Sequence, residues 1–190
     1  MAHDKKRNNK PDENENDVAT TDSLVDRLRT LAREEGGPSV ARRAIVLLEG
    51  GYEGEDFLRV VGGSHAEGIL SGAPALYWPE LWGARALLHI WDDSAEKPVI
   101  KALGNQSWRV REMAAKVCAA REIGEISEIS VLLTDEHPRV RAAGARALAV
   151  RGDASSIDTL ELLLRDYDKE VRRTAQQSIK ALRERLAEAE

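Results

Sequence analysis

The chain has 190 residues, of which 42% are hydrophobic and 32% charged, a composition that suits one folded domain or one short array of repeats. Its net charge of -5 argues against a protein that binds nucleic acid through bulk charge alone. The single cysteine, Cys118, excludes an internal disulfide, and no run reaches the ~18 apolar residues of a membrane span.

Residues 1–22 carry many charges and almost nothing that could be buried, which predicts a disordered N-terminal tail. The first residues also lack the apolar segment of a secretory signal, so we expect a cytoplasmic protein. Residues 23–190 are predicted to form one domain of helical repeats.

The first part of this domain, residues 23–61, is predicted to hold degenerate repeats. Helical periodicity starts after Ser23, and a second helix is expected from Val40 to Leu48 with Ser39 as its cap. A short third helix is expected over residues 55–61. Residues 62–78 are rich in glycine and are predicted to be an irregular loop with one helical turn in its centre, at residues 66–70.

Regular repeats are predicted for residues 79–190. A Val-Arg pair recurs at Val110-Arg111, Val140-Arg141 and Val171-Arg172, at spacings of 30 and 31 residues. Such a period marks a solenoid, in which each unit must stack on its neighbours to bury its apolar face. Helices are expected over residues 96–103, 108–121, 126–134, 139–150 and 156–165, and from 170 onward. The chain is therefore predicted to be an all-α, right-handed α-solenoid of about four to five helical pairs.

These repeats resemble a known family. Leu132-Leu133-x-Asp135 followed by Val140-Arg141, and Leu163-Leu164-x-Asp166 followed by Val171-Arg172, are similar to HEAT repeats, and their short, alanine-rich form resembles the HEAT-like repeats of phycobilisome lyases. The resemblance implies that the helix beginning with Val-Arg faces the hollow of the array. It also implies a ladder of charged residues between neighbouring turns, at Arg111, Asp135, Arg141, Asp166 and Arg172.

Charge is sorted between the two kinds of helix. The three Val-Arg helices hold twelve Lys or Arg against two Glu, a net +10, whereas the stretches between them hold nine acids and one Arg, a net -8. This predicts a basic inner face that could bind a partner. The candidate contact residues are a row of Arg85, Lys116 and Arg146, a second row of Arg109 and Arg139 near the turns, and two tryptophans beside them, Trp78 and Trp108. Alternatively, these charges pair across the repeats and cancel.

The favoured function is a non-catalytic scaffold or adaptor that binds an acidic segment of a partner protein. The alternatives are a protein that binds a nucleic-acid backbone in the same groove, as HEAT-like DNA-binding or glycosylase-type proteins do, and an accessory protein of the HEAT-like lyase type. We expect no cofactor, no metal site and no membrane partner. The four histidines, His3, His65, His89 and His137, share no ligand spacing, and Cys118 is expected to be a buried, inert thiol.

Overall fold

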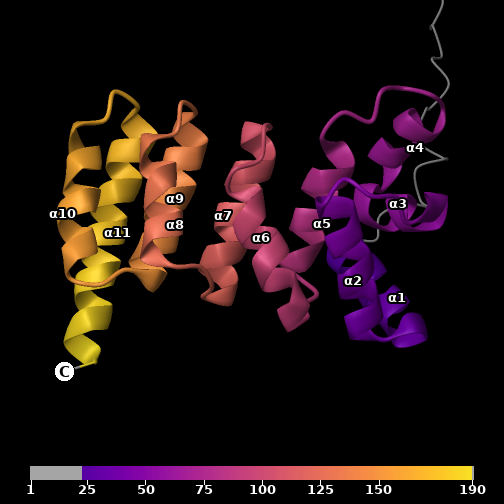
Figure 1. The fold of residues 1–190 in the computed structure, drawn as a ribbon, viewed down its shortest axis with the longest axis horizontal. Coiled ribbons are helices and arrows are strands. Elements are labelled where there is room, and N and C mark those ends of the chain that lie inside the picture. The colour runs from indigo at the N-terminus through magenta and orange to yellow at the C-terminus, as the bar shows by residue number, and fades with distance from the viewer. Residues whose placement is uncertain (1–22, 190) are drawn as a thin grey trace, which may run out of the picture.

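The computed structural model describes residues 23–189, so the tail predicted for residues 1–22 lies outside the described part. All regular structure in that part is helical, and consecutive helices stand side by side along one direction (Figure 1). The prediction of an all-α solenoid is therefore confirmed.

Eleven α-helices and three short 3₁₀ helices make up the described residues. The α-helices are α1 (Leu24–Glu35), α2 (Gly37–Leu48), α3 (Gly54–Gly62), α4 (Ser64–Leu70), α5 (Trp78–Leu87), α6 (Glu96–Ala102), α7 (Trp108–Arg121), α8 (Ile126–Ser130), α9 (Pro138–Arg151), α10 (Ser155–Leu162) and α11 (Lys169–Glu188). The 3₁₀ helices are η1 (Asp93–Ala95), η2 (Val131–Thr134) and η3 (Leu163–Arg165), of which the last two complete α8 and α10.

The helices form two layers. Helices α2, α5, α7, α9 and α11 pack directly on one another in that order, whereas α1, α3, α6, α8 and α10 pack mainly on the helix that follows or faces them in the same repeat. The described residues thus contain five pairs, α1/α2, α3/α5, α6/α7, α8/α9 and α10/α11, with α4 resting on α3.

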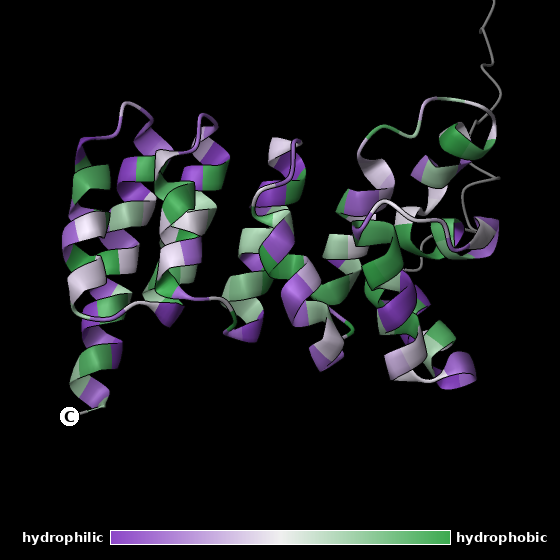
Figure 2. Ribbon diagram, in the orientation of Figure 1, coloured by the Kyte–Doolittle hydropathy of each residue, from purple (hydrophilic) through white to green (hydrophobic). Residues whose placement is uncertain are grey.

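The core is one continuous cluster between the layers. Its regular part is built from the valine of each Val-Arg pair, Val110, Val140 and Val171, which are fully buried among alanines and leucines. Figure 2 shows hydrophobic and hydrophilic residues alternating along the helices, and mostly hydrophilic residues at the upper turns of the C-terminal repeats. Neither layer can hide its stripe alone, so stacking supplies the burial that each repeat lacks.

The N-terminal repeats differ in detail from the sequence prediction. Helix α2 starts at Gly37 instead of Val40, and Gly36, with φ at 85°, precedes it, so Ser39 is not the cap. Pro38 lies in the first turn, where its missing N–H costs no hydrogen bond. The stretch predicted as an irregular loop contains α4, which is longer than the expected single turn.

Candidate functional site

Two arginine–aspartate pairs join the regular repeats. Arg111 donates to both carboxylate oxygens of Asp135, from Nε at 2.7 Å and from Nη2 at 3.0 Å. Arg141 binds Asp166 in the same way, at 2.7 and 2.8 Å. The Nη1 atom of each arginine donates to two backbone carbonyls of its own turn. Each guanidinium therefore ties one turn to the next with fixed, two-point geometry.

Both aspartates are held ionised. Burial by itself would raise the pKa of Asp135 and of Asp166. Burial is the largest single influence, but the hydrogen bond from the arginine, the backbone N–H two residues on and the arginine charge together outweigh it, so both pKa values lie below the usual range. The two pairs are nearly buried, so little of either ion pair is accessible to solvent.

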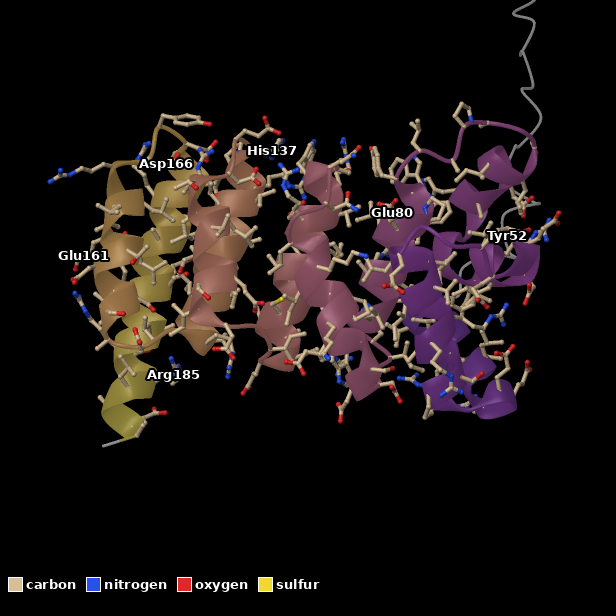
Figure 3. All side chains as sticks on the ribbon, viewed as in Figure 1. Tyr52, Glu80, His137, Glu161, Asp166 and Arg185 are labelled. Atoms are coloured by element: carbon tan, nitrogen blue, oxygen red, sulfur yellow. The ribbon has the colours of Figure 1, made fainter. Side chains whose placement is uncertain are left out.

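Arg172, the fifth residue predicted for the ladder, differs from Arg111 and Arg141 in its contacts. Its Nη1 atom donates to the carbonyls of Asp166 and Tyr167, at 2.7 and 3.0 Å, as its counterparts do in their own turns. Within residues 23–189 it forms no ion pair with a carboxylate. At the other end of the ladder, Glu80 stands one repeat before Arg111 and accepts a hydrogen bond from Asn105 at 2.8 Å. Figure 3 shows Glu80, His137 and Asp166 along the same edge of the array.

A second set of arginines holds the opposite ends of the same helices, and sequence reasoning missed it. Arg121 donates to the carbonyls of Leu87 and Leu88, and Arg151 to that of Gly124. Arg185 repeats the arrangement with the carbonyls of Ala149 and Gly152. A cation at these carbonyls satisfies acceptors that a helix end leaves open. The 30-residue spacing of Arg121 and Arg151 was the available signal.

The turn edge between α5 and α9 carries a row of aromatic rings and arginines. The Trp78 ring lies 6.0 Å from that of Trp82 and 5.1 Å from that of Tyr77. Arg109 follows, 5.4 Å from the Tyr77 ring and 4.3 Å from the Trp108 ring. Trp108 stacks flat on His137, at 3.6 Å and 7°. Trp78 and Trp108, both predicted as contact residues, are half-buried, and Trp78 lies against Tyr77. His137 and Tyr77 belong to the same edge and were not predicted.

Glu112 neutralises part of the predicted basic surface. This glutamate is 7% exposed, and its Oε1 lies 2.8 Å from Lys116 Nζ and 3.1 Å from Arg139 Nη2. Arg139 also lies 5.5 Å from the Trp108 ring. The two predicted rows therefore meet at one buried acid, so the alternative of internal pairing holds for Lys116 and Arg139.

Two other cations predicted for the contact surface are more exposed to solvent. Arg85 and Arg146 are exposed on α5 and α9, and Arg146 Nη2 donates to the Thr174 hydroxyl at 3.3 Å. Among the described residues neither forms an ion pair. Burial, together with the charges of Arg85 and Arg121, lowers the pKa of His89. Arg85, Arg109 and Arg146 are thus the contact candidates that no carboxylate in residues 23–189 neutralises.

The described residues offer little for covalent or metal chemistry. Burial raises the pKa of the Cys118 thiol to about 12, so it is not a thiolate nucleophile at neutral pH. No group of histidines, cysteines and acids in residues 23–189 is arranged to hold a metal ion. No helix among them is long and apolar enough to cross a membrane.

One comparison with known proteins found a matching family. Residues 126–189, which span α8 to α11, match the family model of HEAT repeats. This stretch includes both Asp135 and Asp166 and two of the three Val-Arg pairs. A search of curated proteins found no match.

Proposed function

We propose that this protein is a non-catalytic scaffold that binds an acidic segment of a partner protein across α5, α7 and α9. The proposed contact is the arginine–aromatic surface, defined as Tyr77, Trp108, Arg109, His137 and Arg139, together with Arg85, Lys116 and Arg146 on the same three helices. The observation that carries the proposal is the position of Arg109 between the rings of Tyr77 and Trp108.

That position prepares Arg109 to bind a carboxylate. The two rings lie at 5.4 and 4.3 Å from its guanidinium carbon, so they restrict the side chain and shield it from part of the solvent. An arginine ordered in advance loses less entropy when it forms paired hydrogen bonds with an acidic group. Trp108 and Tyr77 then supply amphipathic contact area of the kind that anchors protein interfaces.

The charge balance on these helices favours an anionic partner. Arg85, Arg109, Lys116, Arg139 and Arg146 share α5, α7 and α9 with two carboxylates: Glu112, which faces Lys116 and Arg139, and Glu80, which accepts from Asn105. A hollow of about 880 Å³ opens beside Tyr77, Trp108 and Arg109, and its lining also includes Lys101 and the acids Glu49 and Glu80. Side chains of a bound segment can enter there, which supports a protein segment as the ligand.

The packing of the two layers supports the proposal that the binding surface lies on the inner side of the array. Helices α5, α7 and α9 pack directly on one another, whereas α6 and α8 pack on their own partners. In a curved stack, the layer whose members lie closer together is the inner one. HEAT repeats are commonly protein-interaction scaffolds, and the family is generally non-catalytic, which agrees with the proposal. The short repeats resemble those of phycobilisome lyases, but this resemblance identifies no residues that would bind a pigment.

The test uses the full chain and a synthetic peptide rich in aspartate and glutamate with one central aromatic residue. The variant Arg85→Glu with Arg146→Glu is expected to weaken peptide binding at least about tenfold, because both cations are exposed and their reversal repels the ligand. Its melting temperature is expected to stay close to that of the wild type. The matched control, Arg33→Glu with Arg165→Glu, makes the same change in net charge at exposed positions on α1 and η3.

Two results contradict the proposal. Equal loss of binding in the control variant would mean that only net charge matters. Preferential binding of a single-stranded oligonucleotide, with an affinity that falls steeply as salt rises, would assign the surface to nucleic acid instead.

A further inference from the structure

A strongly acidic segment of the chain precedes the first helix. Residues 12–17 have the sequence Asp-Glu-Asn-Glu-Asn-Asp, so four of six residues are acids and none is a cation. The apolar residue Val18 follows directly. The chain itself thus contains a segment with the chemistry of the ligand proposed for the arginine–aromatic surface.

The first turn of α1 fixes the point from which this segment extends. Ser23 is the N-cap of α1, and its hydroxyl oxygen accepts from the backbone N–H of Asp26 at 3.3 Å. Leu24 and Leu28 are buried in the core. Asp17 comes only six residues before Ser23, so the acidic segment is attached to a defined place on the array.

This place lies at the end of the α1/α2 pair that borders the hollow beside Tyr77. Helices α1 and α2 are joined by Gly36 alone and pack against each other (Figure 1), so they run in broadly opposite directions. Glu49, which directly follows α2, lines the hollow of about 880 Å³ together with Tyr77 and Trp108. Because the start of α1 lies beside the end of α2, the acidic segment joins the array at the end that carries this hollow.

The length of chain before Ser23 suits the distance to the proposed surface. An extended chain spans about 3.3 Å per residue, so Asp17 and Asp12 can lie up to about 20 and 36 Å from Ser23. Helix α1 packs on α2, α2 on α5, and α5 on α7. Packed helices lie about 8–10 Å apart, which puts α5 and α7 about 16–30 Å from α1. Residues 12–17 cover this range.

The cations beside the hollow complement the segment. Arg109 lies between the rings of Tyr77 and Trp108, and Lys101 lines the same hollow. Neither cation forms an ion pair within residues 23–189. Leu76, which also lines the hollow, is 72% exposed and offers an apolar contact for Val18.

The acids of the lining restrict where the segment can bind. Glu49 and Glu80 balance Lys101 and Arg109 within the hollow, so the hollow as a whole is close to neutral. Arg85 and Arg146 add two exposed cations on α5 and α9 that no carboxylate in residues 23–189 neutralises. The carboxylates of residues 12–17 therefore belong on the cationic side of the hollow, toward α5 and α7.

We propose that residues 12–17 are an intramolecular ligand of the arginine–aromatic surface, with their carboxylates on Arg109 and Lys101 and with Val18 on Leu76. This inference rests on the proposed function, because it assigns an occupant to the same surface. A short tether gives the attached segment an effective concentration of about millimolar. An acidic partner must displace it, so the apparent affinity for the partner falls by the fraction of chains in which the surface is free.

The test compares the wild-type full chain with a variant that neutralises the segment: Asp12→Asn, Glu13→Gln, Glu15→Gln and Asp17→Asn. The synthetic acidic peptide described above is expected to bind this variant about tenfold more tightly than the wild type. The matched control neutralises four exposed acids elsewhere and should change the affinity by less than about twofold. Its substitutions are Glu34→Gln, Glu122→Gln, Asp158→Asn and Glu188→Gln.

NMR of the isotope-labelled chains without peptide provides a second measurement. Outside the substituted segment, the shifts that differ between the wild type and the variant are expected to centre on Tyr77, Trp108 and Arg109. These differences should persist when the protein is diluted about tenfold, because an intramolecular contact does not depend on concentration. Differences that vanish on dilution would assign the contact to a second copy of the chain and overturn the proposal.

The outcomes separate this inference from the proposed function. Equal peptide affinity of the wild type and the neutralised variant, or an equal gain in the control, overturns the inference. If Arg85→Glu with Arg146→Glu still weakens peptide binding, the proposed function stands in that case. Failure of every chain to bind the peptide would instead contradict the proposed function, and the shifts at Trp108 and Arg109 would then decide alone whether residues 12–17 occupy the surface.

Discussion

The two halves of the array stack helices in the same way but connect them with different chemistry. In the C-terminal half, two buried ion pairs, Arg111 with Asp135 and Arg141 with Asp166, join successive turns. In the N-terminal half one arginine, Arg43, forms ion pairs with three acids. It lies 2.7 Å from Glu35, 2.7 Å from Asp56 and 3.4 Å from Glu53. Its guanidinium also lies 4.4 Å from the Phe57 ring.

The junction between the halves combines both patterns. Glu80 occupies the ladder position of the α5 repeat and Asn105 that of the following turn, so a single hydrogen bond from Asn105 to Glu80 stands where Arg111 makes two to Asp135. The hydrogen bond between successive turns is thus kept at the junction, but an amide replaces the guanidinium as the donor.

The largest expected effect is in the C-terminal half. Asp166→Asn leaves the buried guanidinium of Arg141 without a counter-charge, which should lower the free energy of unfolding by about 3 kcal/mol. Urea unfolding measures this loss of free energy. The control Asp158→Asn, at an exposed position on α10, should change stability by less than about 0.5 kcal/mol. Equal effects of the two substitutions would remove the distinction between ladder and surface.

A smaller effect is expected in the N-terminal half. Arg43→Gln should cost about 1–2 kcal/mol, because its partners are partly exposed and water can solvate them once the arginine is gone. Part of this cost is the lost packing on Phe57. Thermal unfolding of Arg43→Gln and of Asp166→Asn, measured under the same conditions, shows which variant loses more stability. A larger loss for Arg43→Gln would reverse the comparison.

Acid should weaken the ladder of the C-terminal half. Because folding lowers the pKa values of Asp135 and Asp166, their contribution is complete above the ordinary aspartate value of about 4 and is lost as pH falls through the lowered values. Unfolding free energies between pH 6 and 3, for wild type and for the double variant Asp135→Asn with Asp166→Asn, measure this. The variant should start less stable and decline less steeply; parallel curves would contradict the assignment.

The smallest effect is expected at the junction. Glu80→Gln keeps an oxygen that accepts from Asn105, so it should change stability by less than about 0.5 kcal/mol. Asp135→Asn, the matching change one repeat later, removes a counter-charge and should cost several times more. Comparable losses in differential scanning calorimetry would show that charge matters equally at both positions.

The sequence predicted the architecture well because it repeats. The spacing of the Val-Arg pairs located α7, α9 and α11, and the bounds of α7 are those predicted. The helix-end bonds of Arg121 and Arg151 escaped prediction, since they reach backbone carbonyls of the preceding repeat, whose position depends on how the repeats stack. Likewise, Lys116 lies one helical turn after Glu112, but Arg139 reaches the same acid from 27 positions away.

The central claim is that arginines on one helix serve two purposes, and α9 offers the direct test. Arg141 is bound to Asp166, whereas Arg146, five residues on, is exposed. The unfolding free energies of Arg141→Gln and Arg146→Gln should be measured side by side. We predict a loss of about 3 kcal/mol for Arg141→Gln and less than about 0.5 kcal/mol for Arg146→Gln. Equal losses would contradict the division between ladder and binding surface.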